Sequence, residues 1–261
     1  MMRPLHVVIL AAGEGTRMRS NRPKMLQPLG GRPLLSHLLD TAQALQPERV
    51  HVVVGSGADA VMAACADYSV EWVQQQERLG TGHAVLQAMP GIPDGSDVLV
   101  LLGDHPLLPL ALLESMRDGF RGPLALLTTE LEDPTGYGRI LRDPGGNIIG
   151  VVEHHEAAPE QHRIREVNTG IIMARAENLR AWLDRIGCDN AKGEYYLPDI
   201  FALARAEYGE IQGFLADDPQ DLEGANDRAQ LAALERRYQA REAARLMAQG
   251  VQLMDPARID V

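Results

Sequence analysis

Residues 5–15 read LHVVILAAGEG, a short β-branched and apolar run that passes into small residues and glycine. Such a run predicts a buried strand that leads into a loop. Runs of the same kind, VHVVV and VLVLL, occupy residues 50–54 and 98–102, and each ends at a glycine. Apolar residues at helical spacing follow the first loop: Leu34, Leu35, Leu38, Leu39 and Ala42. This alternation predicts an α/β fold with a doubly wound, mostly parallel sheet that helices cover on both faces.

The second half of the chain has a different pattern. LALLTTEL and NTGIIMA read as strands, and the segments DPTGYGRI and DPGGN between them are rich in turn residues, which predicts a β-rich insertion in or beside the sheet. From Ala225 to Gln249 the pattern is helical and highly charged, and Gly250 supplies a C-cap. Its narrow apolar stripe consists of Leu231, Leu234, Tyr238, Leu246 and Met247. So thin a stripe predicts a helix that lies along a surface.

Composition excludes several classes of protein. The 261 residues are 45% hydrophobic and 23% charged, as in an ordinary globular protein, and the net charge is −11. This charge argues against a nucleic-acid partner and against an anionic membrane surface. The run Leu5–Ala12 is too short to cross a membrane, so we expect no membrane insertion. Cys65 and Cys188 are too few for a disulfide framework and indicate free thiols, so we expect a cytoplasmic protein.

The glycine-rich loop after the first run is expected to bind phosphate, because glycine turns expose backbone amides at the carboxyl edge of a sheet. Two common phosphate motifs do not fit it. The dinucleotide motif G-x-G-x-x-G requires a glycine where this chain has Met18. The P-loop requires Gly-Lys-Ser/Thr, whereas Lys24 follows Pro23 and lies well beyond Gly15.

The pattern that remains is L-A-A-G-x-G-T-R-M-x4-P-K over residues 10–24. Its small residues leave room for a base or ribose, its glycines expose amides, and Arg17 and Lys24 supply two cations for a polyanion. The pattern resembles the signature of the sugar-nucleotide pyrophosphorylases. The arginines outside it, Arg19, Arg22 and Arg32, are interpreted as solvated loop charges.

Further segments follow in the order of one subfamily. They are QQQERLGTGHA (74–84), LLGDHPLL (101–108), EDPTGYGRI (132–140), VEH (152–154), EVNTGI (166–171), KGEYYLPDI (192–200) and EGAND (223–227). Over essentially its whole length the chain resembles the N-terminal uridylyltransferase domain of the bacterial bifunctional N-acetylglucosamine-1-phosphate uridylyltransferase/glucosamine-1-phosphate N-acetyltransferase. The resemblance implies a Rossmann-like nucleotidyltransferase fold, with a nucleotidyltransferase domain over residues 1–227 and a linker helix over 228–261.

The implied reaction joins UTP and N-acetylglucosamine 1-phosphate to give UDP-N-acetylglucosamine and pyrophosphate, for peptidoglycan and lipopolysaccharide precursors. It needs no covalent nucleophile, because the attacking phosphate oxygen is already ionised, and positioning with charge stabilisation carries the catalysis. Arg17 and Lys24 are expected to hold the triphosphate, and Asp104, after the third run, is a candidate Mg²⁺ ligand. By resemblance, Asn226 is the second ligand of the Mg²⁺ cofactor, and Arg17, Lys24 and Asp104 form the catalytic set.

The resemblance also implies a substrate-binding set. The nucleotide side comprises Leu10, Ala11, Ala12, Gly13, Lys24, Gln75, Gly80 and Thr81, together with Leu102, Gly103 and Asp104. The sugar side comprises Gly138, Glu153 and Asn168, with Asn226 near the phosphates. Glu194, Tyr195 and Tyr196 are expected to line the same pocket. The adjacent His154 and His155 suggest a metal cluster, but a solvated loop is the favoured interpretation.

Two departures from the family are expected to matter. Pro198 stands where family members commonly carry threonine, so a capping hydroxyl is lost there. The hexapeptide-repeat domain that carries acetyl transfer and trimerises full-length family members is missing after residues 228–261, so the chain is interpreted as truncated or free-standing. Two alternatives stay open: a nucleotidyltransferase for another sugar 1-phosphate, and a non-catalytic sugar-nucleotide-binding module.

Overall fold

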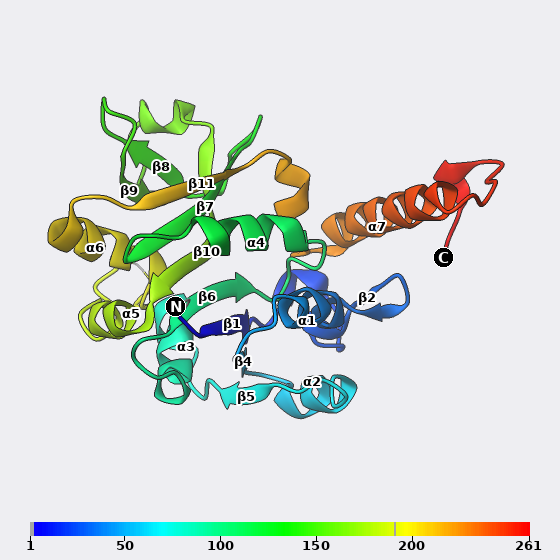
Figure 1. Ribbon diagram of the computed structural model, residues 1–261, viewed down its shortest axis with the longest axis horizontal. Helices are drawn as coiled ribbons and strands as arrows, with labels where there is room; N and C mark the ends of the chain where they lie inside the picture. Colours follow the sequence, from blue (N-terminus) through cyan, green and yellow to red (C-terminus); the bar gives the residue numbers. More distant parts are fainter. Residues whose placement is uncertain (1–2, 191) are drawn as a thin grey trace.

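The computed structural model describes residues 3–190 and 192–261, and a nine-stranded sheet runs through its centre (Figure 1). Four strands form a parallel half: β1 (Leu5–Ala11), β4 (Arg49–Val54), β5 (Glu71–Gln74) and β6 (Asp97–Leu102). Within this half β6 and β4 flank β1, and β5 forms the edge. The carboxyl ends of these strands therefore meet at one edge of the sheet, where ligands of open α/β sheets bind.

Helices cover both faces of the sheet, as predicted. One face carries α1 (Leu34–Ala44), α2 (Ala58–Ala64) and α4 (Leu110–Gly119). The other carries α3 (Thr81–Ala88), α5 (Ala176–Leu183) and α6 (Ile200–Tyr208). Val7 and Val8 are both fully buried but belong to the two different apolar clusters, because successive strand residues point to opposite faces. A continuous apolar strand between two helical layers is the pattern expected for a buried parallel sheet.

The second half of the chain completes the sheet and adds a small lobe, as expected from its turn-rich pattern. The added strands are β7 (Leu124–Glu130), β8 (Arg139–Arg142), β9 (Ile148–Val152), β10 (Glu166–Arg175) and β11 (Gln212–Ala216). Strand β10 lies antiparallel between β6 and β7, and β11 pairs parallel with β7. The β8–β9 hairpin branches from β10 and stands above the sheet in Figure 1. It forms the second wall around the carboxyl edge of β1 and β6.

Short elements connect these layers. A two-stranded ribbon consists of β2 (Pro28–Leu29) and β3 (Arg32–Pro33). The 3₁₀ turns are η1 (Thr16–Met18), η2 (Lys24–Leu26), η3 (Met89–Gly91), η4 (Gln161–Arg163), η5 (Leu197–Asp199), η6 (Pro219–Leu222) and η7 (Pro256–Arg258). Pro198 lies in the first turn of η5, which leads directly into α6. The proline therefore stands at the start of a helical segment, a position that its fixed φ favours.

The C-terminal helix α7 (Arg228–Ala248) differs from its predicted bounds and stripe. It begins at Arg228 because the Asp227 carboxylate accepts a hydrogen bond from the Gln230 backbone amide at 2.9 Å and caps the helix. In its first half Leu231 and Leu234 are buried as predicted. The predicted stripe is wrong in the second half, where Met247 is 42% exposed and the helix projects from the body (Figure 1).

The second half of α7 instead buries two residues that the apolar pattern did not include. Gln239 and Ala243 are 3% and 1% exposed. Gln239 is covered because the chain after the helix folds back, and its side-chain oxygen accepts a hydrogen bond from the Val261 amide at 2.7 Å. Among the described helices, none is long and apolar enough to cross a membrane. Of the two free cysteines, Cys65 is buried and Cys188 is exposed.

Candidate nucleotide and sugar-phosphate site

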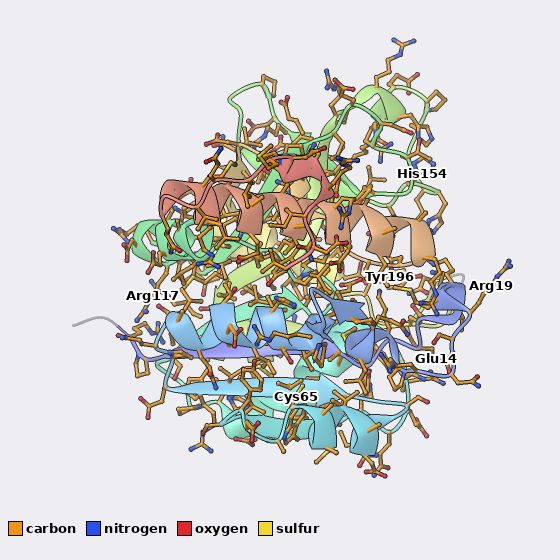
Figure 2. The ribbon with its side chains drawn as sticks, turned by 90° about the vertical axis from the view of Figure 1, so that its right-hand side faces the viewer. Glu14, Arg19, Cys65, Arg117, His154 and Tyr196 are labelled. Atoms are coloured by element: carbon orange, nitrogen blue, oxygen red, sulfur yellow. The ribbon has the colours of Figure 1, made fainter. Side chains whose placement is uncertain are left out.

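A cavity of about 940 Å³ opens at the carboxyl edge of the parallel strands. All the predicted site residues except Ala11, Gly103 and Tyr195 line it: Leu10, Ala12, Gly13, Arg17, Lys24, Gln75, Gly80, Thr81, Leu102, Asp104, Gly138, Glu153, Asn168, Glu194, Tyr196 and Asn226. In Figure 2, Tyr196 lies between two parts of the molecule. The glycine-rich loop, marked by Glu14 and Arg19, is on one side, and the upper lobe, marked by His154, is on the other. The structure therefore brings together residues from both ends of the chain.

Ala11 and Gly103 lie beneath the cavity. The Ala11 side chain belongs to the buried apolar cluster under α1. A Cβ on Gly103 would lie 2.9 Å from Met25 Sδ and 3.0 Å from the Leu10 carbonyl oxygen. Gly103 is therefore required by the close approach of β6 to its neighbours, and the binding roles of both residues stay predictions.

The glycine-rich loop places its two cations by different means. Gly15 has a φ of 63°, and a Cβ there would lie 2.6 Å from Lys24 Cβ, so glycine allows both the left-handed turn and the close contact. The turn leads into η1, which carries Arg17 at the surface. Lys24 begins η2 and is only 8% exposed. The loop thus buries one cation and leaves the other free to reach across the cavity.

Lys24 connects the two predicted metal ligands. Its Nζ donates to Asp104 Oδ2 at 2.5 Å and to Asn226 Oδ1 at 2.9 Å, although Lys24 and Asn226 are 202 positions apart. Arg17 Nη2 donates to the same Asn226 oxygen at 3.1 Å. Burial opposes ionisation of Asp104, but its interactions with His105 and with Lys24, which also donates a hydrogen bond to it, outweigh burial and lower its pKa. The cluster is therefore an ionised carboxylate and an amide oxygen held by two cations.

These two oxygens suit a hard divalent cation. Asp104 Oδ2 and Asn226 Oδ1 converge on a single positive group, the Lys24 ammonium, which marks a position where a cation is stabilised. Mg²⁺ prefers such oxygen donors and commonly takes only one or two from the protein, with phosphates and waters completing its shell. Within residues 3–190 and 192–261, no group of three or more His, Cys, Asp or Glu side chains could hold a metal ion. Asp104 and Asn226 therefore supply the two protein oxygens that converge on this point.

The predicted nucleotide side of the cavity is built from β5 and α3. Strand β5 was not predicted, because its sequence EWVQ is short and has polar residues at both ends. In the structure its side chains are only partly buried. It places Gln75 directly after the edge strand, where the side chain is 4% exposed. Gly80 has a φ of 106°, and a Cβ there would lie 2.5 Å from the Tyr195 carbonyl oxygen, so only glycine fits this start of α3. Gln75 is thereby held against the loop that carries Gly80.

The predicted sugar side is built from the upper lobe. The Gly138 carbonyl accepts a hydrogen bond from the Asn168 amide at 2.9 Å, which joins the loop before β8 to β10. A Cβ on Gly138 would lie 3.3 Å from Glu153 Oε1, so the three predicted sugar-side residues lie next to one another. Burial raises the pKa of Glu153. A carboxylate, an amide and a glycine that leaves space between them form a wall suited to hydroxyl groups.

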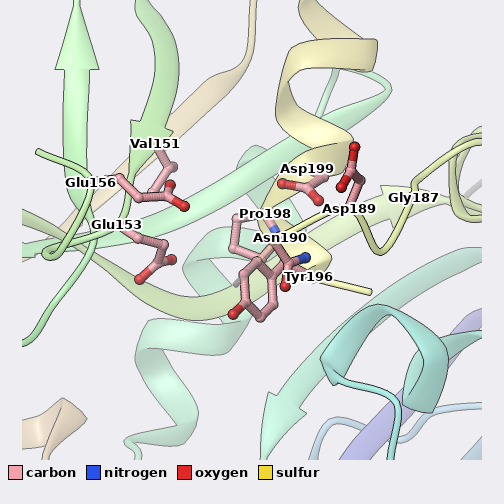
Figure 3. Close-up of a pocket in the computed structure, with 9 residues that line it drawn as sticks. All are labelled: Val151, Glu153, Glu156, Gly187, Asp189, Asn190, Tyr196, Pro198 and Asp199. Carbon is pink, nitrogen blue, oxygen red and sulfur yellow. The ribbon is translucent and has the colours of Figure 1, made fainter. Parts of the chain in front are cut away.

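Glu153 also belongs to a smaller hollow of about 320 Å³ beside the main cavity. Figure 3 shows Glu153 and Glu156 facing Tyr196 and Asp199. Tyr196 directly precedes η5, and Asp199 is the last residue of η5. The hollow is acidic, since Asp189 also lines it. It adjoins the main cavity, since Glu153, Tyr196 and Pro198 line both.

Several residues at the site were not assigned from the sequence. His83 contacts Gln75, and Tyr137 and His105 line the cavity beside the predicted residues. His155 lines it too, whereas His154 points to Arg139 at 3.3 Å, so the two histidines diverge. The family-like segments GTGHA and GYGRI contain His83 and Tyr137 and were the signal that could have found them.

Comparison with known proteins places the chain in a family. The MobA-like NTP transferase domain matches residues 7–144, which is more than half of the chain. The Bifunctional protein GlmU of Xanthomonas oryzae pv. oryzae is 54% identical over all 261 residues, and the chain spans 57% of that protein. The same protein of Alkalilimnicola ehrlichii is 52% identical over 261 residues, with 56% of its length covered.

The likeness extends to a solved structure of low sequence identity. A nucleotidyl transferase from Methanothermobacter thermautotroptrophicus superposes with a TM-score of 0.63 at 18% identity, over 90% of this chain and 97% of that one. At this identity the match concerns the fold, and it agrees with the Rossmann-like nucleotidyltransferase fold that was predicted. The cavity at the carboxyl edge and the match over residues 7–144 lead to one conclusion: the chain belongs to the family of MobA-like NTP transferase domains.

Proposed function

We propose that the chain is a uridylyltransferase that joins UTP and N-acetylglucosamine 1-phosphate to give UDP-N-acetylglucosamine and pyrophosphate. The observation that carries the proposal is the cluster of Lys24, Asp104 and Asn226 inside the main cavity, next to the glycine-rich loop. The identity of 54% to a GlmU protein over the full chain supports the choice of substrates. The product would supply precursors of peptidoglycan and lipopolysaccharide.

The proposed chemistry is a direct displacement at the α-phosphorus of UTP. A phosphate oxygen of the sugar phosphate forms the new bond to this phosphorus, the bond to the oxygen bridging the α- and β-phosphates breaks, and pyrophosphate leaves with that oxygen. Because the attacking oxygen is already ionised, no side chain has to serve as a nucleophile. The protein's work is to bring two polyanions together and to stabilise the charge that develops.

Arg17 and Lys24 would carry that stabilisation. Lys24 reaches the middle of the cavity from a buried position, and Arg17 approaches the same point from the surface. Both cations contact the neutral Asn226 oxygen, and Lys24 also pairs with the Asp104 carboxylate, so the phosphate oxygens of the substrate would have to replace these partners. We propose that Lys24 moves from Asp104 and Asn226 to the triphosphate, which frees both oxygens.

Asp104 and Asn226 would then hold a divalent metal, which we propose is Mg²⁺. When bound, the metal would neutralise phosphate charge and favour departure of pyrophosphate. Gln75, Gly80 and Thr81 would bind the uridine, at the end of the cavity formed by β5 and α3. Gly138, Glu153 and Asn168 would bind the sugar at the opposite end.

The proposal extends to location and assembly. We propose a cytoplasmic enzyme, since the substrates are a nucleotide and a sugar phosphate and Cys65 is a free buried thiol. The chain spans little more than half the length of its GlmU relatives. We propose that trimerisation belongs to the part of those proteins that this chain does not span.

Pyrophosphate release tests the function directly. The chain is incubated with each of UTP, CTP, ATP, GTP and dTTP, in combination with N-acetylglucosamine 1-phosphate, glucosamine 1-phosphate or glucose 1-phosphate. The highest kcat/KM is expected for UTP with N-acetylglucosamine 1-phosphate. Preference for another sugar would support the alternative nucleotidyltransferase, and tight UTP binding without pyrophosphate release would support the non-catalytic module.

A further inference from the structure

The orientation of the Gln75 side-chain amide can be assigned from its neighbours. Its Nε2 lies 3.2 Å from the Gly80 carbonyl oxygen and 3.0 Å from His83 Nδ1. A backbone carbonyl can only accept, so the end of the amide that faces Gly80 must be the amino group. Both amino protons are then used, one on Gly80 and one on His83. The carbonyl oxygen of Gln75 is the end left for the cavity, which this residue lines.

The same reasoning assigns the tautomer of the His83 ring. Because Gln75 donates to it, Nδ1 must accept, and the ring proton of the neutral imidazole lies on Nε2. This nitrogen lies 3.1 Å from Gln87 Nε2, one turn further along α3. Two N–H donors cannot pair, so we assign the Gln87 amide the reversed orientation, in which its oxygen accepts the His83 proton. The ring also lies near Tyr195, with ring centroids 6.3 Å apart. A packed imidazole thus presents one acceptor to Gln75.

We infer that His83 is a positioning residue that sets the preference for uracil by locking the Gln75 amide with its oxygen toward the base. The inference rests on the proposed function. Uracil carries a ring N–H at position 3, which an amide oxygen can accept. Cytosine carries an unprotonated nitrogen at that position, so the same oxygen would face another acceptor. With cytosine bound, the Gln75 oxygen and the ring nitrogen would both be acceptors, and neither would have a hydrogen-bond partner. Such an unpaired buried group lowers the binding affinity for cytosine relative to uracil.

Gln75 alone would not give this discrimination. The terminal torsion of a glutamine amide is broad and roughly two-fold, so the amino and carbonyl ends exchange easily unless neighbours distinguish them. With the amide reversed, an amino group would face the base and suit cytosine. Two acceptors, Gly80 and His83, hold the amino end away from the cavity. His83 is the one that a substitution can remove, since Gly80 acts through its backbone.

The test compares two substitutions at one position. His83→Leu removes the acceptor and keeps an apolar side chain of similar reach, whereas His83→Asn keeps an oxygen acceptor at the δ position. Dissociation constants of UTP and CTP are measured by titration calorimetry, and kcat/KM for both is measured by pyrophosphate release. We expect the UTP:CTP ratio to fall about fivefold to tenfold in the leucine variant, which is the weight of one net hydrogen bond. In the asparagine variant we expect most of the ratio to remain.

A matched control separates this role from general damage to the cavity. His155→Leu removes another histidine that lines the cavity, on the sugar side, and the UTP:CTP ratio is expected to be unchanged. If His83→Leu does not fold, His83→Ala removes the same acceptor without adding bulk. A leucine or alanine variant with the wild-type UTP:CTP ratio would overturn the inference. An asparagine variant whose UTP:CTP ratio falls as far as that of the leucine variant would overturn it too. Wild-type protein that neither binds nor uses UTP would instead overturn the proposed function.

Discussion

Lys24 is the residue on which the site is centred. It is 8% exposed, and its ammonium satisfies the oxygens of Asp104 and Asn226 at once. A buried cation of this kind is stable only while it stays paired, so removal of its partners would leave a costly charge. The same pairing keeps two oxygen ligands oriented toward one point before any substrate enters. Lys24 therefore organises the site in the free protein as well as in the proposed reaction.

Lys24→Met is expected to lower kcat by about 10²–10³-fold, the usual effect of removing one preorganised charge-stabilising group. Initial rates of pyrophosphate release measure this. Arg32→Met serves as the control, because Arg32 is paired with Asp40 outside the cavity, and its kcat is expected to stay within about twofold of wild type. A Lys24 variant with a rate like that of the control would remove Lys24 from the mechanism.

Asp104→Asn keeps the shape of the side chain and removes its charge. We expect the affinity for Mn²⁺, a spectroscopic probe for the divalent site, to fall more than about tenfold in the presence of UTP, because a hard cation loses its anionic ligand. Electron paramagnetic resonance of free Mn²⁺ gives the dissociation constant. Asp133→Asn, in the loop before β8, is the matched control. Equal Mn²⁺ affinity in the two variants would contradict the assignment of Asp104.

At the scale of elements, the start of α7 joins stability to the site. Asp227 caps the helix through the Gln230 amide, and Asn226, one residue earlier, contacts Lys24 and Arg17. The Asn226 amide itself donates to Gln230 Oε1 at 2.7 Å. The first turn of α7 therefore fixes both the backbone and the side chain of the proposed metal ligand. A helix that looks peripheral in its second half completes the site with its first turn.

Asp227→Ala is expected to destabilise the protein by about 1 kcal/mol, the typical cost of losing an N-cap. Urea unfolding followed by circular dichroism measures this. Because the cap also positions Asn226, the same variant is expected to lower Mn²⁺ affinity in the presence of UTP. Asp255→Ala removes the cap of the exposed turn η7 and should change neither quantity appreciably. Unchanged Mn²⁺ affinity in Asp227→Ala would separate α7 from the site.

The sequence predicts the strands and helices that bury continuous apolar residues, and it misses those that do not. β1, β4 and β6 were predicted because each contains a β-branched and apolar run that leads to a glycine and is interrupted only by His6 in β1 and His51 in β4. β5 was missed because an edge strand packs only partly and needs no such run. In α7 the apolar pattern failed at Gln239, which is covered only because the chain end folds back onto it. Contacts between distant segments leave no local periodicity to read.

The sequence predicted the residues around the cations at the site, but not the side-chain contacts that hold the neighbouring residues in place. Motif spacing identified Arg17, Lys24 and Asp104, and resemblance added Asn226, and all four line one cavity. His83 was not identified, since its role depends on which nitrogen faces Gln75 across the start of α3. Such a contact is decided by packing and amide orientation, which no motif specifies.

At the scale of the whole molecule, a buried histidine pair couples folding to pH. His6 and His51 lie on neighbouring strands, with His6 Nδ1 3.0 Å from His51 Nε2, and His51 is fully buried. Burial lowers the pKa of His51 from 6.5 to about 4. Between these two values the unfolded chain binds a proton that the folded chain does not, so the free energy of unfolding falls as pH decreases from about 6.5 toward 4.

His51→Gln is expected to reduce this pH dependence, because glutamine fills part of the space and does not titrate. The measurement is the free energy of unfolding in urea at pH 7 and pH 5, for wild type and variant. Wild type should lose more stability between the two pH values than His51→Gln does. His155→Gln, at an exposed position, is the control and should retain the wild-type slope. An unchanged slope in His51→Gln would show that the pair does not titrate on unfolding.

The central claim is that a sugar-phosphate oxygen attacks the α-phosphorus of UTP in the cavity between the glycine-rich loop and the upper lobe. Isotope transfer tests it most directly. N-acetylglucosamine 1-phosphate carrying ¹⁸O in its phosphate is incubated with UTP and Mg²⁺, and both products are analysed by mass spectrometry. The account predicts that all label stays in UDP-N-acetylglucosamine and that pyrophosphate carries none. Label in pyrophosphate, or no nucleotide sugar formed, would contradict it.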